Sequence, residues 1–204
     1  MRYKFPNYIF QISILIIIAA CSQQKNPVTA PSSEENKIIV AKGDAVAKAL
    51  ILTLKGEVKQ AIDSNGVVEA IAVCNEKAIP LTQNVASLAE EGTEIKRTTS
   101  KPRNPANSPD EFEKEALKHF EKLIAAGESF PDNYTQKVVD GGDTSYYYYK
   151  PMKMEALCLL CHGTPETMAP EVKDVVAKLY PEDQAAGYQE GDFRGLIRVK
   201  FKNL

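Results

Sequence analysis

The segment "CLLCH", from Cys158 to His162, restricts the chain more than any other feature. Two cysteines that are separated by two residues and followed directly by histidine form the attachment pattern of c-type haem. Each thiol can add to one vinyl group of the porphyrin to form a thioether, and His162 can then bind the iron. The motif therefore predicts one haem c, held covalently through Cys158 and Cys161, with His162 as a metal ligand.

Two other chemistries use paired cysteines, and the sequence supports them less well. Structural zinc needs four ligands, usually as two clustered pairs, and the second pair would have to be Cys74 and His119, which lie far apart in sequence. A thiol–disulfide site favours a first cysteine at a helix start that follows a strand. Because "KMEAL" precedes Cys158, we expect no helix start there, and haem is favoured.

The N-terminus has the pattern of an export signal. Arg2 and Lys4 precede an apolar run over residues 9–20, which is too short to span a bilayer, so residues 1–20 are predicted to be a signal peptide. The sequence "IAAC" that ends at Cys21 matches a bacterial lipobox and predicts lipid on Cys21, which would anchor the protein to a membrane. Residues 21–36 are polar and proline-containing, as expected for the lipidated cysteine and a flexible tether.

This pattern places the protein in the cell envelope as a periplasm-facing lipoprotein. Ser22 does not provide an inner-membrane retention signal of the aspartate kind, which favours the outer membrane. Removal of residues 1–20 takes away two basic residues and no acidic one, so the formal charge falls from −2 to −4. Nucleic-acid binding needs a basic face and is not expected. Residues 37–204 are long enough for one domain with its own core.

The order of the expected elements indicates an α+β fold. Val67, Ile71, Cys74 and Ala78 share one face of a helix, which Pro80 is expected to break or kink. Ser108 is expected to cap a later helix. Helices are expected at 37–63, from 67, through 85–91, at about 109–126, around the cysteine motif and at 170–180; strands are expected at 93–100, in a hairpin around 140–143 and at the C-terminus. The hairpin includes four consecutive tyrosines, 146–149, of which alternation turns two inward and lets one line a haem pocket.

The residues alone leave the second axial ligand open. Candidates are Met152, Met154, Met168, His119, Cys74, a lysine, or no protein ligand at all. Cys74 lies on an apolar helix face, so it is either a buried inert thiol or an iron ligand. The basic residues Arg97, Lys101 and Arg103 are either solvated or pair with haem propionates, and Arg97 and Arg103 are the predicted propionate partners because guanidinium binds carboxylate through two parallel hydrogen bonds.

Four segments resemble the PAS-like single-haem c-type cytochrome family: "VVEAIAVCNEKA", "KRTTSKPRNPANSPDEFE", "YYYKPMKMEALCLLCHG" and "GYQEGDFRGLIRVKF". The resemblance covers roughly residues 40–203, and the Arg-Asn-Pro segment is its most specific part. It implies a PAS-like antiparallel sheet preceded by long N-terminal helices. It also implies an axial pair of His162 and Cys74.

The expected function is that of a lipid-anchored monohaem c-type cytochrome that carries single electrons at low potential to an unidentified redox partner protein. No catalytic constellation is found in the sequence, so an enzyme is not expected; a peroxidase would need an open coordination position and His119 as its acid–base group. The alternative is a haem-based redox or gas sensor for CO or NO that acts through a separate partner.

Overall fold

The computed structural model describes residue 1, residues 28–140 and residues 142–204. The predicted signal peptide and the predicted lipid attachment at Cys21 therefore fall outside the described residues, apart from Met1. Helices are α1 (Ser33–Asn65), α2 (Val67–Ser87), η1 (Pro105–Asn107), α3 (Glu111–Ala125), α4 (Ala156–His162) and α5 (Pro170–Leu179); strands are β1 (Val28–Thr29), β2 (Glu94–Thr98), β3 (Tyr134–Asp140), β4 (Asp143–Lys153) and β5 (Phe193–Phe201). Within this part of the chain, no helix is long and apolar enough to cross a membrane.

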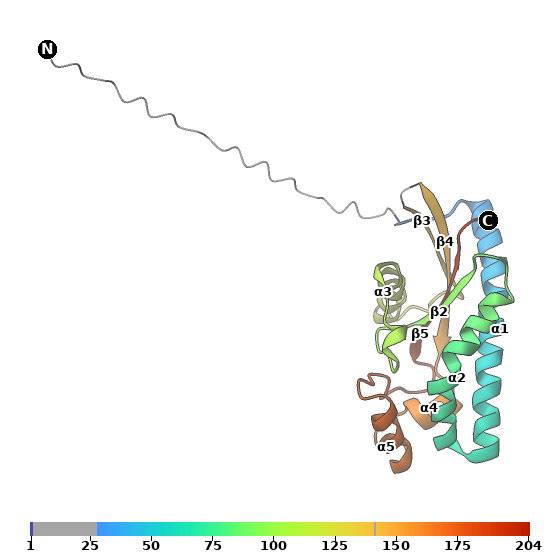
Figure 1. The fold of residues 1–204 in the computed structure, drawn as a ribbon, viewed down its shortest axis with the longest axis vertical. Helices are drawn as coiled ribbons and strands as arrows, with labels where there is room; N and C mark the ends of the chain where they lie inside the picture. Colours follow the sequence, from blue (N-terminus) through green and yellow to red (C-terminus); the bar gives the residue numbers. More distant parts are fainter. Residues whose placement is uncertain (2–27, 141) are drawn as a thin grey trace.

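The strands form one antiparallel sheet in the order β1-β3-β4-β5-β2. Two long helices precede most of this sheet in sequence, and α1 lies along its length (Figure 1). The β3–β4 hairpin around Asp140 and Asp143 is present as expected. The predicted α+β fold, with an antiparallel sheet after long helices, is confirmed.

The fold begins earlier than the expected boundary at residue 37. Val28 and Thr29 pair with β3, and Ser32 caps α1 in a capping box with Glu35, whose side chain accepts a hydrogen bond of 2.7 Å from the Ser32 amide. Such a cap satisfies backbone donors that the first helical turn leaves unpaired. Residues 28–36 thus belong to the folded domain, and their prediction as a flexible tether is wrong.

Both faces of the sheet are covered by helices. Tyr146 and Tyr148 pack in a core with α1 residues such as Ile39, whereas Tyr147 and Tyr149 pack in a second core with α3. Side chains alternate between the faces of a strand, so a sheet covered on both sides buries all four tyrosines. The prediction that only two turn inward is wrong, because it assumed one solvent-exposed face.

α1 approaches the sheet closely at Gly43. A Cβ added to this glycine would lie 2.2 Å from Cγ of Tyr148, far inside the 3.5–4.0 Å at which carbon atoms attract. Glycine therefore sets the distance between α1 and β4 at this point.

Two helix boundaries differ from the sequence expectation. α2 continues through Pro80 to Ser87 as one helix, so the expected break and the separate helix over 85–91 are absent. α3 is capped by Asp110 rather than Ser108, through a capping box with Glu113. The same kind of cap forms two residues later than expected.

The cysteine motif lies at the end of the molecule away from the β3–β4 hairpin. α4 and α5 pack beside α2 there, with Ile71, Val172 and Tyr180 in a shared apolar cluster. Figure 1 shows α4 and α5 at this end, next to the α1–α2 turn. The cysteine motif thus lies between the sheet and the end of the molecule that α4, α5 and the α1–α2 turn form.

Candidate haem site

α4 carries the complete motif on one short helix. Residues three and four apart face the same side of a helix, so Cys158, Cys161 and His162 project together. All three are partly buried, and both thiols are free. The helix ends at Gly163, where an added Cβ would lie 2.6 Å from the carbonyl oxygen of Leu159.

The start of α4 differs from the sequence expectation that no helix begins near Cys158. α4 starts at Ala156, soon after β4, so Cys158 lies in its first turn. The sheet is antiparallel rather than built from the βαβ units in which such sites occur. This topology, and not the helix position, counts against thiol redox chemistry.

Two adjoining cavities open beside the motif, one of about 230 Å³ and one of about 520 Å³. Both are lined by Cys158 and His162, and the smaller one is also lined by Cys74 and Cys161. Together they fall within the size range of cofactor pockets. An apolar wall of the smaller cavity comes from α1, α2 and α4: Leu54, Val58, Ile62, Ala70, Ile71 and Leu157.

The structure brings Cys74 to the motif although 84 positions separate it from Cys158. Cys74 lies on α2 and is partly buried. Burial raises the pKa of its thiol, while the positive charges of Arg97 and Arg103 act in the opposite direction. A buried thiol of this kind becomes a thiolate when a metal ion compensates its charge.

The imidazole of His162 is oriented by a backbone carbonyl. Its Nδ1 lies 2.7 Å from the carbonyl oxygen of Ala185. Because a carbonyl oxygen only accepts, Nδ1 carries the proton and Nε2 is free to bind a metal. Burial, followed by the charges of Arg103 and Arg194, lowers the pKa of His162 to about 3, so the ring is neutral, as a ligand must be.

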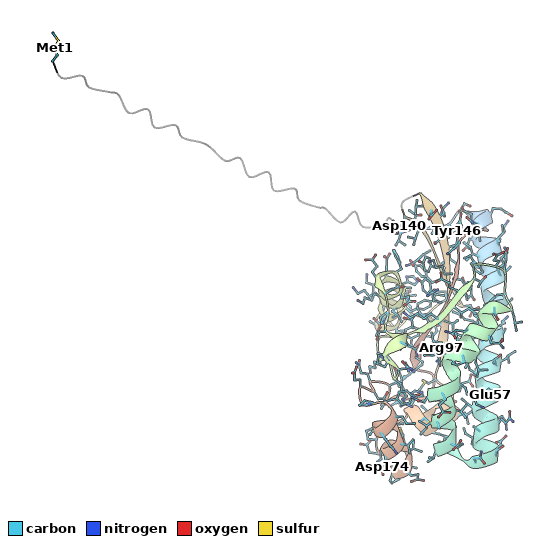
Figure 2. All side chains as sticks on the ribbon, in the orientation of Figure 1. Met1, Glu57, Arg97, Asp140, Tyr146 and Asp174 are labelled. Carbon is cyan, nitrogen blue, oxygen red and sulfur yellow. The ribbon has the colours of Figure 1, made fainter. Side chains whose placement is uncertain are left out.

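Three arginines lie around the cavities. Arg103 donates two hydrogen bonds of 3.1 Å to Asp183 and one of 2.7 Å to the carbonyl of Cys161. Arg97 forms no ion pair within the described ranges, and burial lowers its pKa. Figure 2 shows Arg97 between the sheet end marked by Tyr146 and the α5 end marked by Asp174.

Arg194 was missed by the sequence reasoning. It lines both cavities and donates hydrogen bonds to Thr99 Oγ1 at 2.9 Å and to the Lys101 carbonyl at 3.0 Å. No carboxylate partner is found for it in the described part of the chain. The only available signal was its place in the "GDFRGLIRVKF" segment that carries the family resemblance. Lys101 lies over the ring of Tyr188, 5.4 Å from its centre.

The other proposed ligands are distributed differently. Met152 and Met154 line the larger cavity, and Lys55 lines both but pairs with Glu155. His119 lies on α3, where it stacks on Tyr134 at 4.4 Å. It lines neither cavity, so the ligand set expected for zinc is not assembled; nor does the described part of the chain contain another metal-binding group of three or more His, Cys, Asp or Glu. Residues that line neither cavity also include Met168 and Tyr146 to Tyr149.

Fold and pocket together define a PAS-like α+β domain whose cysteine–histidine motif faces a large cavity. The chain belongs to the Tll0287-like family, whose model matches residues 23–201. The crystal structure of the cyanobacterial haem protein Tll0287 matches with a TM-score of 0.57 at 21% identity, over 85% of this chain and 98% of that one. At this identity the match shows the fold. No curated protein matches the chain.

Proposed function

We propose that the protein is a lipid-anchored monohaem c-type cytochrome that transfers electrons at the cell envelope. The observation that carries the proposal is the convergence of Cys158, Cys161, His162 and Cys74 on one cavity. The matching solved structure is that of a haem protein. When bound, haem supplies a one-electron iron couple; the residues of the chain attach it, orient it and set its potential.

Cys158 and Cys161 are suited to the two thioether bonds. They lie one helical turn apart and face the same cavity, and the apolar wall of that cavity suits the porphyrin face. His162 offers a neutral imidazole with its Nε2 free. Structural features of the pocket therefore fit a covalently attached haem.

Cys74 is the proposed second iron ligand. Cys74 lines the smaller cavity together with the motif. Lys55 also lines this cavity, but it is paired with Glu155. Met152 and Met154 line only the larger one. A thiolate ligand donates charge to iron and favours a low potential, whereas methionine raises it.

The charges around the cavities fit two propionates. Of Arg97, Arg103 and Arg194, only Arg103 has a carboxylate partner within the described residues. Buried cations are expected to be paired, and two carboxylates would offset Arg97 and Arg194. We therefore propose Arg97 and Arg194 as propionate partners. The propionate role of Arg103 stays a prediction. It is less favoured than that of the other two arginines, because Nε and Nη2 of Arg103 already donate hydrogen bonds to Asp183.

With His162 and Cys74 both on iron, no coordination position is left for a substrate. His119 lines neither cavity, so it is not placed to serve as the acid–base group of a peroxidase. Electron transfer to a redox partner protein is the function that such a closed site supports. Lipid on Cys21 and a periplasm-facing place at the outer membrane remain proposals from the sequence.

The second candidate is a haem-based redox or gas sensor. The observation that favours it is that Cys74 lines an open cavity, so a diatomic ligand could take the coordination position that this thiolate leaves. In this case, reduction would release Cys74 and the ferrous form would bind CO or NO. A carrier would keep both protein ligands, His162 and Cys74, on the iron in both oxidation states.

The test compares wild-type holoprotein with Cys74→Ala and with Met152→Leu as the matched control. The wild type should carry one covalent haem by mass and show a low-spin ferric EPR signal typical of thiolate ligation. Cys74→Ala should lose that signal and Met152→Leu should keep it. A wild-type methionine-type spectrum, or a Cys74→Ala spectrum identical to wild type, would contradict the ligand assignment. CO binding to the ferrous wild type would select the sensor over the carrier.

A further inference from the structure

We propose that the Arg103–Asp183 ion pair sets the redox potential of the haem, both through its charges and through the hydrogen bonds by which it holds the carbonyl that orients His162. This inference rests on the proposed function, because it requires His162 to bind iron. Both residues lie outside the cysteine motif and act through Ala185. They are positioning residues and not ligands.

The pair forms a closed set of hydrogen bonds behind the imidazole. Arg103 Nη2 contacts the carbonyl oxygens of Cys161 at 2.7 Å and of Ala185 at 3.3 Å. Its Nε and Nη2 each donate to Asp183 at 3.1 Å. Asp183 in turn accepts a hydrogen bond of 2.9 Å from the Ala185 amide. Both backbone groups of Ala185 are thus fixed, and its carbonyl oxygen receives the Nδ1 proton of His162 at 2.7 Å.

A backbone contact joins the same two loops. The Gln184 amide donates to the Pro102 carbonyl at 3.0 Å. The "KPRNP" segment therefore meets residues 183–185 through both main chain and side chain, which gives this most specific sequence segment a structural role. The region is tightly packed, since Ala185 is fully buried and the side chains of Arg103 and Asp183 are only 10% and 12% exposed.

Two physical effects link the pair to the iron. A guanidinium that shares the Ala185 carbonyl withdraws electron density from it and weakens its pull on the imidazole proton, which makes the imidazole a poorer donor to ferric iron. The charge of Arg103 also disfavours the ferric state, and Asp183 offsets this charge. Loss of Arg103 should therefore lower the redox potential, and loss of Asp183 should raise it.

A purely structural ion pair would behave differently. Arg198 and Glu113 form such a pair within the sheet and α3, with Nε 3.2 Å from the carboxylate. Arg198 is 8% exposed and lines neither cavity. Arg198→Gln is thus a matched control that breaks a buried arginine–carboxylate pair away from the haem.

The experiment measures the midpoint potential and ferric EPR spectrum of four holoproteins: wild type, Asp183→Asn, Arg103→Gln and Arg198→Gln. Asp183→Asn should raise the potential, because the charge of Arg103 is left uncompensated. Arg103→Gln should lower it, because Asp183 is left negative. Each shift should change the ferrous-to-ferric ratio at fixed potential by about tenfold, which equals about 59 mV for one electron. Arg198→Gln should destabilise the protein and leave the potential unchanged.

The inference would be overturned if Asp183→Asn and Arg103→Gln shifted the potential in the same direction. It would also be overturned if the ferrous-to-ferric ratio of both variants at fixed potential stayed within about twofold of the wild-type ratio. Arg103→Lys keeps the charge without the planar fork and should recover most of the Arg103→Gln shift; it also provides the comparison if Arg103→Gln yields no holoprotein. A Lys variant with the full Arg103→Gln shift would refute the charge effect. Wild-type protein without covalent haem or without histidine ligation would instead defeat the proposed function.

Discussion

Replacement of Gly43 by alanine should destabilise the protein although alanine is the better helix former. A new Cβ would lie 2.2 Å from Cγ, 2.6 Å from Cβ and 2.7 Å from Cδ1 of Tyr148. These atoms belong to the root of a side chain that is fully buried, so it cannot swing aside. Either α1 or β4 must move by roughly 1.3–1.8 Å to restore a carbon–carbon contact of about 3.5–4.0 Å.

The size of the effect follows from two opposing terms. Overpacking a well-packed core costs about 1–3 kcal/mol, and a clash this close belongs at or above the upper end of that range. The change from glycine to alanine within a helix returns about 1 kcal/mol. The expected net loss is about 2 kcal/mol, which for a chain of this size lowers Tm by about 4–8 °C.

Gly56 provides the control within the same helix. It is exposed, and a Cβ added there meets no atom within 4 Å. Gly56→Ala should therefore raise the free energy of unfolding by about 1 kcal/mol. Thermal and urea unfolding followed by circular dichroism would measure both variants. A Gly43→Ala protein as stable as wild type would refute the role of Gly43 as the close-approach point between α1 and the sheet.

Two further predictions concern buried polar groups. The hydroxyl of Thr98 is buried without a hydrogen-bond partner in the described structure, so Thr98→Val should raise the free energy of unfolding by about 1 kcal/mol, and a lower urea midpoint would contradict this. Burial alone would raise the pKa of Glu113, but hydrogen bonds from Lys96 and the Asp110 amide, with the charges of Lys96 and Arg198, hold it below its usual value. A carboxyl with a lowered folded-state pKa contributes stability that is present above its unfolded pKa of about 4.3 and is lost as pH falls through the folded-state value. Glu113→Gln should thus lower stability by about 3 kcal/mol at pH 7 and flatten the acid-induced loss below about pH 4.3, as measured by urea midpoints across pH; an unchanged pH profile would argue against the ion pair.

Local chemistry in the sequence explains much of the fold. The β3–β4 hairpin and α5 lie close to where turn residues and proline placed them. Errors occurred where two local signals competed. Apolar periodicity put the start of α1 at residue 37, although Ser32 and Glu35 form an earlier cap. Ser108 and Asp110 are both good caps, and the sequence does not decide between them.

The site was predictable in its parts but not in its assembly. The spacing of Cys158, Cys161 and His162 identified the motif, and helical periodicity placed Cys74 on an inward face. Their meeting depends on how α2 packs against α4 and α5. The contact between Arg103 and Asp183 joins residues 80 positions apart, and the lack of a carboxylate for Arg194 is visible only once its neighbours are known.

α1 belongs to two cores at once. Its N-terminal half packs Ile39, Ala47 and Leu50 against the sheet, while Leu54, Val58 and Ile62 farther along it line the smaller cavity. A porphyrin bound in that space would pack against these three side chains. The helix that braces the sheet would then also be one wall of the proposed haem pocket, so a change in its tilt would be felt by both.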